Sequence, residues 1–174
     1  LREKRIKPHL DDKVLTDWNA LAIAALAKAS RAFKNEEYAE LAQNALKFLN
    51  AKLKNKSWLH RYRAGDAAIE AHLDDYSFLL FAHVELYQCV FDPELLVGAT
   101  ETADTMVDLF WDEKNGGFFF TSKNAESLIV RKKERYDGAT PSGQAVSIYS
   151  LALLSKLTGL TKYDDFAQKT LNAY

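Results

Sequence analysis

The chain has 174 residues, 48% apolar and 27% charged, a balance typical of one globular domain with a sizeable core. With 23 basic and 24 acidic residues, the net charge of −1 argues against the clustered basic surface of nucleic-acid-binding proteins. One cysteine excludes an intrachain disulfide, and no apolar run is long enough to span a bilayer. We therefore expect a cytoplasmic protein with no nucleic-acid or membrane partner.

The first two predicted helices differ in which faces are apolar. Residues 17–33 contain the run Ala20–Ala27, which is apolar on every side and predicts a helix buried all round. Residues 36–53 carry their apolar side chains in one stripe, with polar residues opposite. This second pattern predicts a helix with one buried and one solvated face.

The same alternation recurs twice further along the chain. Residues 75–91 and 143–157 are apolar almost all round, whereas 93–110 and the segment from 163 onward are one-sided. Two concentric layers of helices produce this alternation, because inner helices are covered on both sides and outer helices on one. A plain bundle would make every helix one-sided.

Polar and glycine residues mark the expected ends of these helices. Thr16, Asn35, Asp92 and Thr161 are predicted N-caps, and Gly159 is predicted to end the fifth helix.

Two stretches between the helices read as short strands. One is 58–63, and the other comprises 116–121 and 127–131, which we expect to form a β-hairpin. The fold class that follows is all-α: an α/α toroid fragment of three helical hairpins, about half of an (α/α)6 barrel, with short β-hairpin insertions.

Four ordered motifs then point to a family. Residues 8–19 (PHLDDKVLTDWN), 73–76 (LDDY), 116–119 (GGFF) and 136–143 (YDGATPSG) resemble segments of a family of thioredoxin-domain-containing, spermatogenesis-associated thioredoxin-like proteins. The resemblance implies an N-terminal thioredoxin-like domain, absent from this chain, joined to a toroid similar to those of N-acylglucosamine 2-epimerases and six-hairpin glycosidases. Residues 1–174 would then be one domain fragment, the C-terminal part of that toroid.

The resemblance also predicts partners, and it shows where this sequence differs from the family pattern. The missing part of the toroid and the thioredoxin-like domain would be partners in the parent protein, and the open ends of the fragment would favour a homo-oligomer. Gln144 and Ala145 stand where the family commonly has Asn and Ser. A contact made by the family's Asn is therefore in doubt, although Gln offers the same amide one methylene further out.

The starts of the all-round apolar helices gather the candidate site residues. Glycoside hydrolysis needs two carboxyl groups roughly 5 to 9.5 Å apart. Asp75 and Asp137 are the candidate catalytic pair, with Asp12 as a third carboxylate. The candidate substrate-binding residues are His9, Lys13, Trp18, Asn19, His72, Tyr76, Tyr136, Ser142 and Gln144.

Each of these side chains also has a structural interpretation. The aspartates suit helix caps or ion pairs with Arg61, Arg63 or Arg131, and a tryptophan on a helix is commonly a core residue. His72 suits a general base, a role histidines play in sugar epimerases of this fold, or a satisfied surface histidine. The spacing of His72, Asp74 and Asp75 matches no known zinc motif, so we expect no metal and no cofactor.

Two functions remain open. The first is a carbohydrate-related toroid that binds, hydrolyses or epimerises a sugar. The second is a non-catalytic module that binds a ligand or protein for the attached thioredoxin-like domain, since one fold can host many functions.

Overall fold

The structure, a computed structural model, describes residues 2–126 and 129–173. A short 3-10 turn, η1 (Arg2–Lys4), precedes three strands and six helices. The strands are β1 (Val14–Leu15), β2 (Leu59–Arg63) and β3 (Asp66–Glu70). The helices are α1 (Thr16–Phe33), α2 (Glu36–Leu53), α3 (Leu73–Val90), α4 (Pro93–Phe110), α5 (Gly143–Thr158) and α6 (Lys162–Asn172). Within the described ranges, none of the helices has the length and apolarity that crossing a membrane requires.

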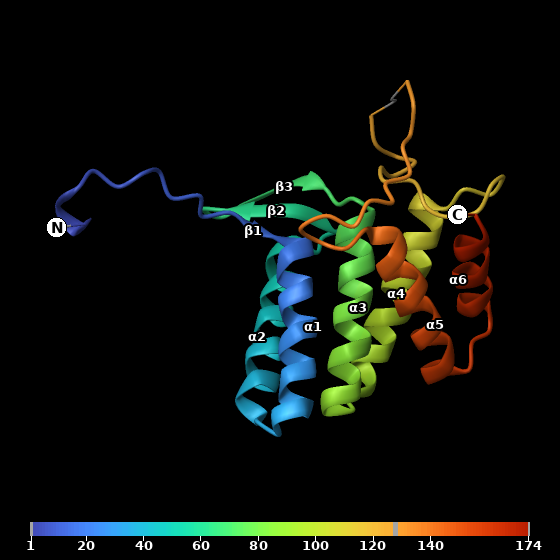
Figure 1. Ribbon diagram of the computed structural model, residues 1–174, viewed down its shortest axis with the longest axis horizontal. Helices are drawn as coiled ribbons and strands as arrows, with labels where there is room; N and C mark the ends of the chain where they lie inside the picture. The colour runs from blue at the N-terminus through green and yellow to red at the C-terminus, as the bar shows by residue number, and fades with distance from the viewer. Residues whose placement is uncertain (1, 127–128, 174) are drawn as a thin grey trace.

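The helices form two layers of antiparallel hairpins (Figure 1). In the inner layer, α3 packs between α1 and α5, and each of these helices also packs against the outer helix that follows it. This confirms the predicted α/α toroid fragment of three hairpins. The outer helices α2, α4 and α6 each bury one face, as their one-sided patterns predict.

Burial follows the layers. Leu80 and Leu151, near the middle of α3 and α5, are completely buried, and Leu21 of α1 is half-buried. Ala22 and Ala25 are exposed although they lie in the most uniformly apolar helix. In the described residues α1 has an inner neighbour on one side, α3, so its opposite flank remains uncovered.

A buried carboxylate ties the three inner helices together in their second half. Glu85 of α3 is 1% exposed, and it accepts hydrogen bonds from Arg31 of α1 and from the Tyr149 hydroxyl of α5. Lys28 of α1 adds an ion pair at 3.0 Å. Two cations and a hydroxyl compensate the cost of burying this carboxylate.

The β structure differs from the prediction. The hairpin consists of β2 and β3, which pair antiparallel around a turn at Ala64 and Gly65, and β1 adds to the other edge of β2. The expected hairpin over 116–121 and 127–131 is wrong as far as it can be tested: residues 116–121 form an isolated bridge, Trp111 to Phe118, and 127–128 lie outside the described residues. This aromatic segment is held by backbone hydrogen bonds to Phe110, Asp112 and Lys132 and by the side chain of Gln144 in α5.

The predicted helix boundaries are largely confirmed. Asn35 and Asp92 cap their helices by accepting the backbone N–H two residues on, and Gly159 ends α5 in a left-handed conformation. Thr161 occupies the N-cap position without a side-chain bond. The expectation for Thr16 is wrong, because it is already helical and its buried hydroxyl donates to the carbonyl of Leu59 on β2.

Candidate functional site at the mouth of the inner helices

The N-termini of α1, α3 and α5 lie at the same end of the inner layer, which we call the mouth (Figure 1). Consecutive aspartates of α3 connect the three helices there. Asp75 Oδ1 accepts the backbone N–H of Asp17 in α1 at 3.0 Å, and Asp74 Oδ1 accepts that of Gly143 in α5 at 3.0 Å. The first N–H groups of a helix lack partners within it and carry the positive end of its dipole. The two carboxylates therefore cap the helices on either side of α3.

Gly143 permits the second of these contacts, the one with Asp74. A β-carbon at this position would overlap Asp74 Oδ1 and would lie 3.0 Å from Leu73 Cγ and 3.1 Å from Ser77 Oγ. The glycine that opens α5 is therefore required by the distance between α3 and α5.

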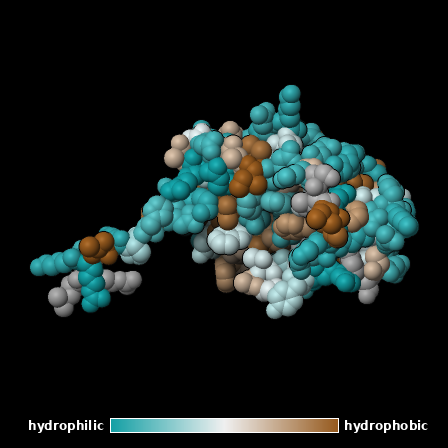
Figure 2. Space-filling view, turned by 90° about the horizontal axis from the view of Figure 1, so that it is seen from above, coloured by the Kyte–Doolittle hydropathy of each residue, from teal (hydrophilic) through white to brown (hydrophobic). Residues whose placement is uncertain are grey.

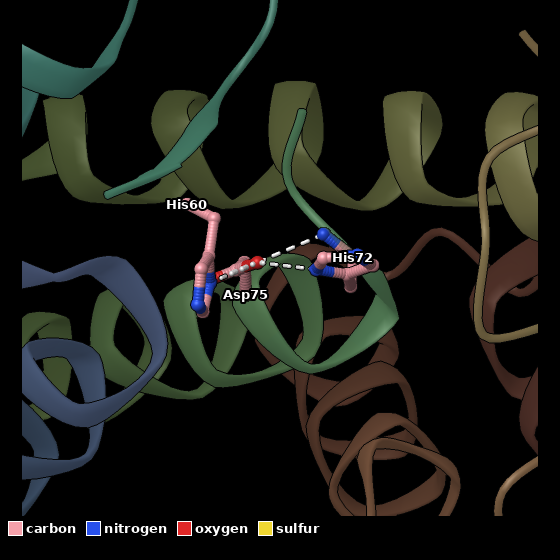
Figure 3. Close-up of side chains that lie close together, drawn as sticks. All are labelled: His60, His72 and Asp75. Carbon is pink, nitrogen blue, oxygen red and sulfur yellow. Dashed lines mark hydrogen bonds and ion pairs between the residues drawn. The ribbon is translucent and has the colours of Figure 1, made fainter. Parts of the chain in front are cut away.

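Asp75 also holds a histidine from the sheet. His60 on β2 places its Nδ1 2.9 Å from Asp75 Oδ1 and 3.1 Å from Oδ2 (Figure 3). Asp75 Oδ2 accepts the backbone N–H of His72 at 2.8 Å. Asp75 is completely buried, so its charge is compensated by these hydrogen bonds and not by water.

His72 completes the cluster from the start of α3. It is the N-cap residue, and the side chain of Asp75 accepts its backbone N–H at 2.8 Å. The imidazole stacks on Phe120 with ring centroids 4.8 Å apart and meets the His60 ring edge-on at 5.5 Å. The backbone N–H of Leu73 bonds to the Phe120 carbonyl, which fixes the long 111–142 loop against the mouth.

Electrostatics separate the titratable groups of the mouth. Burial raises the pKa of Asp74 to about 6, and burial followed by the nearby Asp75 charge raises the pKa of Asp17. The hydrogen bond to Asp75 raises the pKa of His60 against the opposing effect of burial. Burial lowers the pKa of His72. The pKa values of these two imidazoles, whose ring centroids lie 5.5 Å apart, are therefore shifted in opposite directions.

A metal ion is the other chemistry that these residues could support. His60, His72 and Asp75 each offer one ligand atom, all within 4.8 Å of one another, and two histidines with a carboxylate suit zinc or iron. However, Asp75 already accepts two backbone N–H groups and faces His60 Nδ1. Hydrogen bonding therefore accounts for this arrangement without a metal.

Trp18 and Asn19 lie in the first turn of α1. Trp18 is 62% exposed in the described residues, and it lies on the same face of α1 as the exposed Ala22 and Ala25. Asn19 donates from its side-chain amide to the carbonyl of Leu15 at 2.8 Å, which supports the entry into α1.

The candidates from the N-terminal segment lie on an exposed arm that leaves the body of the protein (Figure 1). Asp12 pairs with Arg63 at 2.6 Å, and Lys13 pairs with Asp11 at 2.7 Å. His9 Nε2 lies 3.4 Å from the same guanidinium of Arg63. These contacts match the ion-pair interpretation of Asp12 and place none of the three candidates in the His60–Asp75 cluster.

Three candidates have internal structural contacts. Tyr76 is buried, its hydroxyl accepts the N–H of Trp58, and its ring packs 5.3 Å from Phe110. Gln144 is buried and bonds to both backbone groups of Phe118, which secures the 111–142 loop. The Ser142 hydroxyl caps α5 at Ala145. Burial against protein removes Tyr76 and Gln144 as surface contacts for a ligand.

The expected catalytic pair is not supported by the contacts of its members. Asp137 is exposed on the loop before α5 and accepts the backbone N–H of Ser142 at 2.7 Å, while Asp75 is buried between α1 and α3. Tyr136, 79% exposed, lies beside Asp137 in the chain. Each aspartate thus fixes a different backbone segment, as the capping interpretation predicts.

His60 is the residue that sequence reasoning missed. The residues around His60 in the strand include both aromatic and charged types and form no recognisable motif. No sequence spacing therefore relates His60 to Asp75, which lies 15 positions later. The strand prediction over 58–63 was the available signal, because it placed His60 on an element between α2 and α3. His83, by contrast, is a buried core histidine, and burial lowers its pKa to about 4.

Sequence comparisons reveal relatives over nearly the whole chain. An uncharacterised protein of Caenorhabditis elegans is 31% identical over 177 residues, which is 97% of this chain and 24% of that protein. Human spermatogenesis-associated protein 20 is 29% identical over 185 residues, 99% of this chain and 24% of that protein. The chain is a homologue of spermatogenesis-associated protein 20. It spans about a quarter of the length of these curated relatives, and no protein-family model matches it.

Solved structures share the fold. A family 76 α-mannanase of Bacteroides thetaiotaomicron superposes with a TM-score of 0.77 at 20% identity, over 95% of this chain and 46% of that one. Cellobiose 2-epimerase of Spirochaeta thermophila gives 0.74 at 18% identity, over 92% and 42%. An inactive α-1,6-mannanase of Salegentibacter, with two consecutive aspartates replaced and α-1,6-mannotriose bound, gives 0.71 at 16%, over 92% and 46%. These likenesses establish the α/α toroid fold.

Proposed function

We propose that the chain is part of a carbohydrate-active toroid and that it contributes the mouth of the sugar-binding cavity. The observation that carries this proposal is the convergence of three inner-helix N-termini on one cluster of titratable side chains, His60, His72 and Asp74. The first turn of α1 adds the exposed ring of Trp18. Polar groups orient sugar hydroxyls, and an aromatic face stacks on the apolar face of a sugar ring.

The surface of this end agrees with a polar ligand. Figure 2 looks onto the mouth from above and shows a predominantly hydrophilic surface with isolated apolar side chains. The toroids with the same fold include a mannanase, a cellobiose epimerase and a complex with mannotriose, which raises the expectation of a carbohydrate ligand. In this proposal the 174 residues supply about half of a cavity that the parent protein completes.

A non-catalytic binding domain is the second candidate. It is favoured by the buried state of Asp75, whose two oxygens are committed to backbone groups and His60 and cannot form a hydrolytic pair with Asp137. Sugar binding without turnover in the complete protein would select this candidate.

Binding of sugars by the complete protein tests the proposal. Titration calorimetry with α-1,6-mannotriose, cellobiose and a panel of reducing sugars should reveal a ligand. Trp18→Ala should then weaken binding about three- to ten-fold, the effect of losing one aromatic stacking contact. Phe33→Ala is the matched control, since Phe33 is an exposed aromatic residue at the other end of the same helix. No binding, or equal loss in both variants, would refute the proposal.

A further inference from the structure

We propose that His60 is the proton-transfer residue of the mouth and that Asp75 is its positioning residue. The inference rests on the carbohydrate role proposed above and narrows it to acid–base chemistry on a reducing sugar. The observation behind this inference is the contact between His60 of β2 and Asp75 of α3, which no sequence motif indicates.

The carboxylate fixes which nitrogen of His60 is available. Asp75 faces Nδ1 with both oxygens, at 2.9 and 3.1 Å, so Nδ1 carries the hydrogen and donates it. In Figure 3 the second ring nitrogen points away from Asp75. In the neutral ring Nε2 therefore keeps its lone pair, which is the form of a general base.

Asp75 itself lacks access to a substrate. It is completely buried, and its two oxygens accept the backbone N–H groups of Asp17 and His72 at 3.0 and 2.8 Å. These bonds prevent the carboxylate from rotating, and its charge stabilises the imidazolium that forms when Nε2 takes a proton. Its effect on chemistry is therefore exerted through His60.

The surroundings of His60 support a reversible change of charge. The charges of Asp75, Asp17 of α1 and Asp74 of α3 act on the imidazole, and the His72 ring meets it edge-on at 5.5 Å. The net negative surroundings favour the protonated ring, while the 23% exposure of its side chain leaves it open to solvent. An imidazole whose Nε2 can bind and release a proton is suited to both donate and accept protons.

The chemistry that follows is proton transfer at the carbon beside a sugar carbonyl. Nε2 takes the proton as the C–H bond breaks, and the electron pair forms an enediolate whose charge lies on the former carbonyl oxygen. The imidazolium then returns the proton to the former carbonyl carbon while the neighbouring hydroxyl proton moves to the charged oxygen, which gives the isomeric sugar of the same composition. No oxidant or reductant is needed. Hydrolysis would instead require two accessible carboxyl groups, which Asp75 and Asp137 do not provide.

Histidine titration by NMR tests the positioning part without any substrate. In the complete protein, Asp75→Asn should lower the titration midpoint of His60, because the hydrogen bond between Nδ1 and the carboxylate is lost. Asp66→Asn, at an exposed carboxylate on the same sheet, is the control and should leave the midpoint of His60 in place. Equal midpoints in the wild type and Asp75→Asn would overturn the assignment.

Turnover tests the catalytic part. Reducing sugars that bind should exchange the carbon-bound hydrogen beside the carbonyl in heavy water. His60→Gln should reduce that exchange at least about 100-fold with sugar affinity changed less than three-fold, whereas Asp66→Asn, at an exposed carboxylate of β3, should behave as wild type. Binding without exchange overturns this inference and leaves the carbohydrate proposal standing, whereas absence of binding refutes both. Loss of exchange on adding a chelator would also overturn it, because the cluster would then be a metal site.

Discussion

The two ends of the inner helices are built on different principles. At the end opposite the mouth, α1, α3 and α5 finish with Lys34, Phe91 and Gly159, each in the left-handed conformation. Each of these residues donates its N–H to a carbonyl four residues earlier in its own helix. The caps are local and the three connections are short, while the contact between hairpins in this half of the helices comes from Glu85 with Arg31 and Tyr149.

The mouth is instead held by residues far apart in the sequence. Asp75 bonds to Asp17, 58 positions earlier, and Asp74 bonds to Gly143, 69 positions later. The long connections, with their sheet and aromatic loop, also lie at this end (Figure 1). When a side chain of one helix caps its neighbour, the two helices hold each other in place. Side chains from several elements are then fixed relative to one another, which a catalytic or binding site requires. The local end contributes mainly to stability.

Removing the carboxylate of Asp75, which bonds to groups of α1, α3 and β2, should have the largest effect on stability. Asp75→Ala should lower the free energy of unfolding by about 3 to 5 kcal/mol, because it leaves two buried backbone N–H groups and His60 without their acceptor. Urea denaturation followed by circular dichroism would measure it. Asp66→Ala, which breaks only the exposed pair with Arg61, should cost less than about 1 kcal/mol. Similar costs for the two variants would contradict the distinction between the ends.

Filling the space between α3 and α5 should have an intermediate effect. Gly143→Ala should cost about 1 to 3 kcal/mol, because the added methyl group displaces Asp74 and separates the two helices. Thermal unfolding would report the loss. In Gly138→Ala the new atom would meet only the flexible ring of exposed Tyr136, so this control should be nearly neutral. An unchanged melting temperature in Gly143→Ala would show that the mouth tolerates repacking.

The local end should respond least, and in the opposite direction. Lys34→Gly should stabilise the protein by about 0.5 to 1 kcal/mol, since Lys34 has a φ of 54° that glycine adopts without steric cost. The same denaturation experiment suffices, and the NMR signals of His60 should not move. A shift of those signals would show that the two ends are coupled.

The layers were predictable because periodicity is a local property. The all-round apolar pattern of 75–91 identified an inner helix, and the stripe of 36–53 identified an outer one. The consecutive aspartates were also recognised as candidate caps. Their bonds to the neighbouring helices were not predictable, because Asp75 caps α1 in addition to α3 and Asp74 caps α5.

The hairpin prediction failed for a related reason. Residues 116–121 have strand-like composition, yet Gln144 of α5 occupies the backbone groups of Phe118 that a strand partner would need. Nothing in the local sequence indicates that competition. His60 was likewise overlooked, because a histidine in a strand acquires its role from the helix beneath it.

The sequence by itself determined which segments become helices, which of them lie inside, and where most of them end, because these follow from side-chain polarity and capping within a few residues. Only the tertiary structure decided that Asp74 and Asp75 bridge three helices and that His60 meets Asp75. The physical reason is that a buried carboxylate bonds to whichever N–H groups packing brings within 3 Å, and packing depends on the whole chain.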